Sequence, residues 1–411
     1  MAPQLACNTN APKPPVSKEP ALQNWAKNLT YSAEEVHYPT SVEELQEAVV
    51  NLKKMRGLGS QHSFNTIADS KAHLISTKKM REIVSLDRNL QRITVEAGMR
   101  YGDVCEYLQE NRYAFHNLAS LPHISIAGAC ATATHGSGVG NACLAAAVNG
   151  IELIKANGEQ VYLSRERDGD MFKAAVVGLG ALGIVSKVTL DLLPSYQMQQ
   201  RVYLDMPTSA LEKNFLEIMS SGYSVSLFTD WQNDTVNEIW IKSRIDAESV
   251  VNGPEFFGAA LADRNVHPIV TEPSENCTDQ MGVEGPWYER LPHFKMGFTP
   301  SSGEELQAEY FVPLEAGYEA MKAVEQLKDQ IGPHLFISEI RTIAADDFWM
   351  SPFYNKACTA IHFTFKPHWD AVQQLMPQIE AALDPFAVRP HWGKLFSLAP
   401  AVLQSRIERL K

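Results

Sequence analysis

The sequence predicts an α+β protein with more than one domain, and three observations support this. The chain has 411 residues, and because a domain typically takes ~100–200 residues, two or three domains are expected. Up to Pro194, short strand-like segments alternate with helical ones. Beyond Pro194 the sequence changes to aromatic-rich strands and helices, which predicts a separate α+β domain.

The elements before Pro194 follow from hydrophobic spacing and turn residues. A helix is expected over residues 41–54, because apolar residues recur at helical spacing and Thr40 or Ser41 can cap it. A tight turn over residues 55–65 then leads to strands expected over 73–76, 83–86 and 92–97 and a helix over 101–111. The sequence next predicts a hairpin of strands 151–156 and 160–163 turning at Asn157-Gly158, a helix over 170–177 and a strand over 183–193.

Beyond Pro194, the expected strands and helices include residues 224–231, 238–242, 314–327 and 369–383.

Composition excludes several classes of function. The net charge of −12 and the absence of a Lys/Arg cluster argue against nucleic acid or an anionic membrane as the main partner. No run approaches the ~18 apolar residues of a membrane-spanning helix. Residues 1–23 lack the apolar core of a signal peptide and are predicted to be a disordered leader. The six cysteines lack metal-ligand spacing, so a reducing, cytoplasmic location is expected.

Residues 178–183 (GLGALG) match the G-x-G-x-x-G pattern of dinucleotide-binding proteins. That motif requires a strand before the glycine turn and a helix after it, so that the pyrophosphate lies on the helix N-terminus. Here the order is reversed, since a helical segment precedes the glycines and a β-rich segment follows. These glycines are therefore expected to allow a close approach of the backbone to a ligand or a neighbouring element.

The turn over residues 56–65 (RGLGSQHSFN) combines two glycines with small polar residues. Successive N–H groups of such a turn can form a nest that binds a pyrophosphate without lysine or arginine. His62 lies within this turn, where a lone histidine is more often a capping or solvated residue. The pattern alone leaves both interpretations open.

Residues 118–138 (LASLPHISIAGACATATHGSG) contain almost no large or charged side chains. The backbone here is expected to lie very close to something flat and extended. One explanation is a Gly/Ala-rich loop or strand packed tightly on a neighbour. A bound cofactor is the better explanation, because a second nest-like turn is already present.

Two strand-like segments near the C-terminus carry alternating polar residues. Glu339 and Arg341 share one side of a strand, and His362 and Thr364 share the same parity on another. Such a face is compatible with a binding wall for a hydroxyl-rich ligand or with a solvated sheet face. Residues 389–394 (RPHWGK) place a lysine after an aromatic turn, a pattern that alone is more typical of a surface loop.

Together, GLGSQHSFN, ASLPHISIAGACATATHGSG, EIR, HFT and RPHWGK resemble the vanillyl-alcohol-oxidase superfamily of flavoproteins. The resemblance runs from about Asn24 to the C-terminus, and the combination of motifs is very specific. Within the superfamily, SLPHIS, THGSGVGN, YSVSLFTDW, GPWYERLPHF and EIRT are most similar to the alditol (xylitol) oxidases, and next to the sugar-1,4-lactone oxidases.

The resemblance implies a covalently bound FAD, which His62 carries through the flavin 8α-methyl group. It implies a pyrophosphate-binding turn made of Gly57, Leu58, Gly59, Ser60, Gln61, His62 and Ser63. It implies further FAD contacts at Ser120, Ser125, Gly128, Thr132, Ala133, Thr134, His135 and Val185. The implied substrate-binding set is Ser120, Glu339, Arg341, His362, Thr364 and Lys394, of which Glu339, Arg341 and Lys394 are expected to be catalytic. No metal is expected.

The implied reaction is oxidation of the terminal primary alcohol of an alditol, such as xylitol or sorbitol, to the aldose, with O2 reduced to H2O2. An alcohol proton is too weakly acidic to leave unaided, so Arg341 and Lys394 are expected to stabilise the developing alkoxide. Glu339 is expected to fix Arg341 and accept a polyol hydroxyl. Two alternatives stay open: a sugar-1,4-lactone oxidase or a dehydrogenase, and a flavin- or carbohydrate-binding protein without turnover.

The fold implied is α+β, with a two-subdomain PCMH-type FAD-binding domain and a substrate domain whose large antiparallel sheet is flanked by helices. The expected boundaries are 24–195 for the FAD-binding domain, 196–385 for the substrate domain and 386–411 for a C-terminal segment that returns to the FAD-binding domain. A monomer is expected, with a small polyol and O2 as partners and neither nucleic acid nor membrane. Relatives are expected to continue slightly beyond Lys411.

Overall fold

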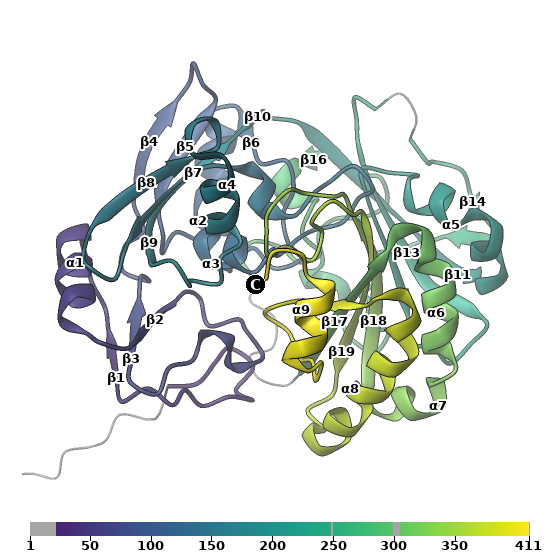
Figure 1. Cartoon of the computed structure of the whole chain (residues 1–411). Helices are drawn as coiled ribbons and strands as arrows, with labels where there is room; N and C mark the ends of the chain where they lie inside the picture. The colour runs from purple at the N-terminus through teal and green to yellow at the C-terminus, as the bar shows by residue number, and fades with distance from the viewer. Residues whose placement is uncertain (1–21, 248–249, 299–304, 411) are drawn as a thin grey trace, which may run out of the picture.

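The computed structural model describes residues 22–247, 250–298 and 305–410. Apart from Leu22 and Gln23, the expected leader lies outside the described residues. Figure 1 shows the first half of the chain, up to β10, on one side of the molecule and a large sheet with its helices on the other. The architecture is α+β with a large antiparallel sheet, as the sequence predicts.

A small parallel sheet begins the chain, in the order β1-β3-β2. Its strands are β1 (Glu35–His37), β2 (Met55–Leu58) and β3 (His73–Ser76), and helix α1 (Val42–Asn51) connects β1 to β2. Ser41 caps α1, because its Oγ accepts a hydrogen bond of 3.2 Å from the backbone N–H of Glu44. The tight turn predicted over residues 55–65 is wrong in its first four residues, since these pair with β3. That partner lies downstream in the chain, so local sequence gives no sign of it.

A five-stranded antiparallel sheet follows, in the order β4-β5-β9-β7-β8. Its strands are β4 (Ile83–Asp87), β5 (Arg92–Glu96), β7 (Val148–Ile154), β8 (Gln160–Ser164) and β9 (Ile184–Asp191). Helices α2 (Tyr101–Glu110), α3 (Ile126–Ala131) and α4 (Arg165–Val176) accompany it, and β6 (Tyr113–Ala114) pairs with β10 (Leu193–Pro194). The predicted hairpin is confirmed as β7 and β8, with Gly158 at a φ of +82° in its turn. Helix α4 is kinked at Gly169, whose φ is +46°, so the helix predicted from residue 170 corresponds to the part after the kink.

The large sheet has ten strands, nine of them in the order β14-β15-β11-β13-β12-β18-β19-β17-β20, with β16 paired to β11. Its strands are β11 (Gln197–Pro207), β12 (Ser224–Thr229), β13 (Thr235–Arg244), β14 (Glu255–Phe256), β15 (Ala259–Leu261), β16 (Gly285–Pro286), β17 (Leu306–Pro313), β18 (Leu335–Ile343), β19 (Cys358–Phe365) and β20 (Arg389–Pro390). Four helices lie between these strands along the chain: α5 (Leu211–Met219), α6 (Gly317–Glu325), α7 (Lys328–Ile331) and α8 (Trp369–Leu383).

The two faces of this sheet differ in character because side chains alternate along each strand. One face carries buried apolar residues that pack against α5, α6 and α8, among them Tyr203, Leu227, Ile340, Ile361 and Phe363. In Figure 1, α6 and α8 lie on the side of the sheet away from the first half of the chain. The polar residues of the other parity therefore belong to the face that meets the first half.

The C-terminal residues lie beside an early turn. The backbone N–H of Phe64 donates to the carbonyl of Gly393 over 2.8 Å, and the Asn65 side chain donates to the carbonyl of Trp392 over 2.9 Å. Helix α9 (Pro400–Arg406) packs near Trp392. The domain boundaries expected at 24–195, 196–385 and 386–411 stay a prediction. Within the described ranges, every helix is too short or too polar to span a membrane.

Candidate functional site

A cavity of about 540 Å³ is lined by the glycine-rich segments of the first half and by the polar face of the large sheet. Its lining includes nearly all the residues expected at the site: Gly57, Leu58, Gly59, Ser60, Gln61, His62, Ser63, Ser120, Ser125, Gly128, Thr132, Thr134, His135, Val185, Glu339, Arg341, His362, Thr364 and Lys394. Ala133 is the exception, since it is 1% exposed and absent from the lining. Its φ of +53° turns the chain between the residues on either side that do line the cavity.

The first wall of the cavity, which we call the cofactor wall, consists of residues 57–63 and 120–135. The two segments touch, because the backbone N–H of Ser125 donates to Oγ of Ser60 over 3.0 Å. A Cβ added at Gly59 would lie 2.5 Å from Oγ of Ser125, and one at Gly128 would lie 2.7 Å from it. A methyl group at either position would displace this hydroxyl, so glycine keeps the two segments in close contact and the wall leaves backbone open to a ligand.

Part of the cofactor wall is helical. Within the segment 118–138, for which the sequence favours a cofactor site over a packed loop or strand, residues Ile126–Ala131 form the short helix α3. Helix α3 fits here because alanine and glycine leave room for close packing. The glycine-rich residues 178–183 do form a loop between α4 and β9, in the order predicted, and they also line the cavity. The expectation that they approach a ligand or a neighbour is therefore compatible with the structure.

His62 projects from the cofactor wall as a neutral imidazole. Its Nδ1 lies 2.9 Å from the carbonyl oxygen of Ser60, and its ring stacks on Trp25 with the centroids 5.3 Å apart. Burial lowers the pKa of His62 to about 4, although the contact with Ser60 opposes this shift. A neutral imidazole keeps a lone pair on one nitrogen, which is what a bond to carbon requires.

The second wall, which we call the sheet wall, is built by register across three strands. Glu309 on β17 and Glu339 on β18 both lie opposite His362 on the central strand β19. The exposed fractions are 1% for Glu309, 6% for Glu339 and 7% for His362. This low exposure favours a binding wall over a solvated sheet face, because a solvated face would expose these side chains. Nε2 of His362 also lies 3.2 Å from Oγ1 of Thr364.

Glu309 is a central group that sequence reasoning missed. Arg341 donates from Nη2 to its Oε1 over 2.6 Å, while Nε2 of His135 lies 3.2 Å and Nδ1 of His362 lies 3.4 Å from its carboxylate. Burial alone would raise the pKa of Glu309, but Arg341 and His135 outweigh it and hold the pKa well below its usual range. Glu309 has the parity of Gln307 in the segment LQAEYFVP. That alternation of polar residues was the available signal.

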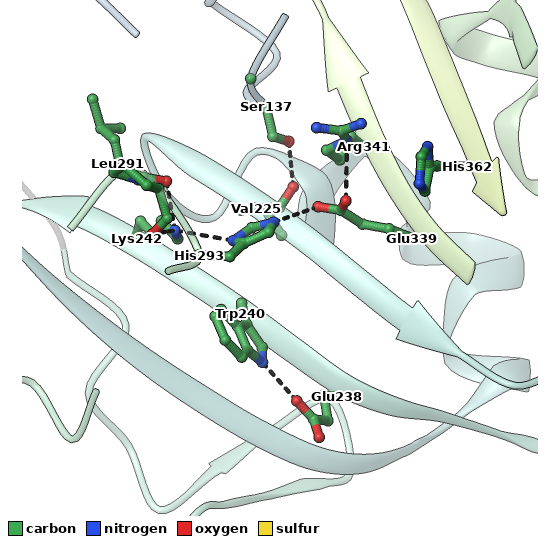
Figure 2. A network of polar contacts seen from close by, with 12 residues as sticks. Ser137, Val225, Glu238, Trp240, Lys242, Leu291, His293, Glu339, Arg341 and His362 are labelled. Atoms are coloured by element: carbon green, nitrogen blue, oxygen red, sulfur yellow. Dashed lines mark hydrogen bonds and ion pairs between the residues drawn. The ribbon is translucent and has the colours of Figure 1, made fainter. Parts of the chain in front are cut away.

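Arg341 lies between two carboxylates of the sheet wall. Besides its bond to Glu309, its Nε lies 3.5 Å from Oε2 of Glu339 (Figure 2). Burial works against ionisation of Glu339, but Arg341 and His293 outweigh it and hold the pKa of Glu339 far below its usual range. The guanidinium is therefore a fixed, desolvated cation at the cavity.

Residues 389–394 do not form the surface loop of which their pattern alone is more typical. His391 and Trp392 are buried, and Lys394 lines the cavity, where its Nζ donates to Oε1 of Gln307. The ammonium also lies 4.9 Å from the centroid of the Phe64 ring. Burial lowers the pKa of Lys394 to about 8, while Glu309 and Glu305 oppose this shift. The loop is drawn inward because β20 pairs with β17.

Comparison with known proteins identifies both halves of the chain. Residues 33–164 match a family model described as an FAD binding domain, and residues 300–411 match one described as D-arabinono-1,4-lactone oxidase. The chain is 42% identical over 394 residues to an alditol oxidase of Streptomyces sp. (strain IKD472), covering 95% of this chain and 93% of that protein. The chain belongs to the alditol oxidase family.

More distant relatives of this alditol oxidase family member also align over nearly the whole chain. An L-gulono-1,4-lactone dehydrogenase of Mycobacterium tuberculosis is 28% identical over 94% of this chain and 92% of its own length. A xylooligosaccharide oxidase from Myceliophthora thermophila, solved with xylobiose, superimposes with a TM-score of 0.72 at 14% identity, covering 94% of this chain and 88% of that one. A solvent-stable cholesterol oxidase also reaches 0.72, at 14% identity, with 91% and 86% covered. The fold is thus that of PCMH-type FAD oxidases.

The cofactor wall of this alditol oxidase family member fits FAD. The whole wall lies within the matched FAD-binding domain, and its glycines leave backbone open to an extended ligand. Oγ of Ser125 is buried and, among the described residues, has no hydrogen-bond partner. A buried hydroxyl left in this way costs free energy unless a ligand completes it. A pyrophosphate or a flavin ring would supply such a partner.

Proposed function

We propose that this protein is an FAD-dependent oxidase that converts the terminal primary alcohol of an alditol, such as xylitol or sorbitol, to the aldose, while O2 is reduced to H2O2. The observation that carries the proposal is a buried wall of hydrogen-bonding groups around one fixed guanidinium, which lines the same cavity as the proposed FAD-binding segments. An alditol is neutral and offers only hydroxyl groups. Such a wall suits it, because each group can donate to or accept from a hydroxyl.

Each side chain of the proposed site has a distinct role. Arg341 and Lys394 stabilise negative charge on the reacting oxygen as the hydroxyl proton leaves. Glu339 orients Arg341 and accepts a hydrogen bond from the polyol. Ser120, His362 and Thr364 bind the remaining hydroxyls. Bound FAD supplies the two-electron oxidation of C1 and the subsequent reaction with O2.

We further propose that FAD is held covalently, through its 8α-methyl group, by His62. Three features support this: the neutral imidazole, its place in the turn with Gly57, Leu58, Gly59, Ser60, Gln61 and Ser63, and its position on the cavity lining. The other proposed FAD contacts are Ser120, Ser125, Gly128, Thr132, Ala133, Thr134, His135 and Val185. Acid-precipitated wild-type protein is expected to stay yellow, whereas His62→Ala should release its flavin to the supernatant. Colourless wild-type precipitate would contradict the covalent bond.

A peroxide assay on the purified protein tests the reaction. Xylitol, sorbitol and glycerol are compared with L-gulono-1,4-lactone, and H2O2 is followed with a coupled peroxidase. Peroxide from polyols is the expected result, and its absence with every polyol would overturn the proposal. A polyol-dependent bleaching of the flavin under anaerobic conditions, without peroxide in air, would instead indicate a dehydrogenase.

A sugar-1,4-lactone oxidase is the second candidate function. The match of residues 300–411 to a lactone oxidase model favours it, as does the lactone dehydrogenase relative at 28% identity. The higher identity to an alditol oxidase favours the first candidate. Turnover of the lactone alone would select the second. A cytoplasmic, monomeric protein is proposed in either case, and gel filtration of the purified chain tests the monomer.

A further inference from the structure

Buried polar side chains form a line that leads away from the cavity behind Glu339 (Figure 2). His293 comes from the segment between β16 and β17, and Lys242 comes from β13. Nε2 of His293 lies 2.8 Å from Oε1 of Glu339, and Nζ of Lys242 lies 3.2 Å from Nδ1 of His293. All three residues are buried, and His293 lines the cavity whereas Lys242 does not.

The contact with Glu339 fixes the tautomer of His293. Because Arg341 and His293 hold the pKa of Glu339 far below its usual range, its carboxylate is ionised and can only accept, so Nε2 of His293 carries the hydrogen and donates a hydrogen bond to it. Nδ1 of His293 then has no hydrogen and accepts from Nζ of Lys242. Nζ of Lys242 also donates to the carbonyl oxygens of Leu291 over 2.6 Å and Pro292 over 2.9 Å. The opposite tautomer would set a nitrogen lone pair against a carboxylate oxygen at 2.8 Å.

The charges of the line are consistent with this assignment. Burial lowers the pKa of His293 to about 4, so the imidazole is neutral at physiological pH. Burial also lowers the pKa of Lys242 to about 7, although the Glu339 carboxylate opposes the shift. The three acceptors around Nζ of Lys242, two carbonyl oxygens and Nδ1 of His293, match the three donors of its ammonium form.

We propose that Lys242 and His293 are positioning residues for the oxidation, which hold Glu339 in the orientation that the substrate meets. Oε1 of Glu339 accepts the hydrogen bond from His293, so Oε2 is available to Arg341 and to a polyol hydroxyl. Lys242 contributes only through His293, since it does not line the cavity. This inference rests on the proposed function, because it requires Glu339 to act on a polyol.

Anaerobic stopped-flow mixing with xylitol tests the inference, because loss of flavin absorbance yields both the limiting reduction rate and the Kd of xylitol. Lys242→Met keeps the length of the side chain but has no donor. A displaced catalytic group typically costs about 100-fold, so a 10- to 100-fold fall in rate over Kd is expected at unchanged FAD content. A Lys242→Met protein within twofold of the wild type would overturn the inference.

The His293 variants give an independent measurement if Lys242→Met fails to fold. His293→Gln keeps an N–H near the position of Nε2, whereas His293→Leu keeps none. Reduction by xylitol is expected to be several-fold faster in His293→Gln than in His293→Leu, and equal rates would overturn the inference. In a Glu339→Gln background, Lys242→Met should add little further loss, because both changes act through one carboxylate. Fully multiplicative losses would contradict action through Glu339.

Glu238→Gln is the matched control. Glu238 lies on β13 with the parity of Lys242, is also buried, and accepts a bond of 2.7 Å from Nε1 of Trp240. It does not line the cavity, so its reduction rate and Kd should equal those of the wild type even if its melting temperature changes. If wild-type protein is not reduced by xylitol, the proposed function fails. If it is reduced and Lys242→Met matches it, only the positioning role fails.

Discussion

The cofactor wall and the sheet wall enclose one cavity but are built in different ways. On the cofactor wall, glycines at 59 and 128 bring backbone against Ser125, and charged side chains are absent from residues 57–63. On the sheet wall, the backbone is paired between strands and the side chains provide the chemistry. In the proposed function, two short stretches of backbone hold an extended cofactor, whereas orienting a small polyol takes side chains gathered from several strands.

Substitution of Arg341 tests the role of the sheet wall and is expected to cause the largest loss of activity. Arg341→Met should lower kcat/KM for xylitol by about 100- to 1,000-fold, the usual loss on removing one donor that stabilises an oxyanion. The buried carboxylates Glu309 and Glu339 would also lose their shared cation, so the melting temperature should fall. Steady-state peroxide production and thermal unfolding measure the two effects.

Arg92→Met is the control for Arg341→Met. Arg92 also bridges two carboxylates, those of Asp191 and Glu166, but it lies on β5 away from the cavity lining. Its kcat/KM should stay at the wild-type value. If Arg341→Met retained more than a tenth of wild-type kcat/KM, the sheet wall would not be where the alcohol is activated.

Gly59→Ala tests the cofactor wall. The added Cβ would lie 2.5 Å from Oγ of Ser125, so this hydroxyl must rotate away or the two segments must move apart. Overpacking of this kind costs about 1–3 kcal/mol, and FAD per protein, measured by absorbance, should fall while the residual holoenzyme keeps its Kd for xylitol.

Two variants complete the test of the cofactor wall. Gly140→Ala is the control, because a Cβ there meets no atom within 4 Å, and its FAD content should be unchanged. The double variant Gly59→Ala/Ser125→Ala removes the clash and should recover FAD beyond Gly59→Ala alone. Full FAD content in Gly59→Ala would mean that close backbone packing is not what forms this wall.

The smallest expected effect is a shift in pH dependence at Lys394. Because burial lowers the pKa of this ammonium to about 8, the positive charge is present below pH 8 and is lost as the pH rises through it. Wild-type kcat/KM should therefore decline above about pH 8. Lys394→Arg keeps its charge, so the decline should move to higher pH at a reduced maximal rate. An unchanged alkaline limb would exclude Lys394 as its source.

Much of the first half of the molecule could be predicted from the sequence, because its signals are local. Ser41 as a cap, the Asn157-Gly158 hairpin and the turn around His62 each depend on neighbours within a few residues. Helix α4 and strand β2 were predicted less well, since a kink at Gly169 and a pairing with β3 do not appear in local spacing.

The sequence by itself determined which groups could do chemistry: the parity of Glu339 with Arg341, that of His362 with Thr364, and the run of small residues against which a cofactor fits. Only the tertiary structure decided that the face carrying Glu339 is buried and that Glu309 joins it, because strand register brings together residues that lie far apart in the chain. It also decided that Lys394 is drawn from an apparent surface loop into the cavity. Burial lowers the pKa of Lys394, whereas the neighbours that packing brings to Glu309 and Glu339 keep both carboxylates ionised. Both effects are properties of packing, which no single segment encodes.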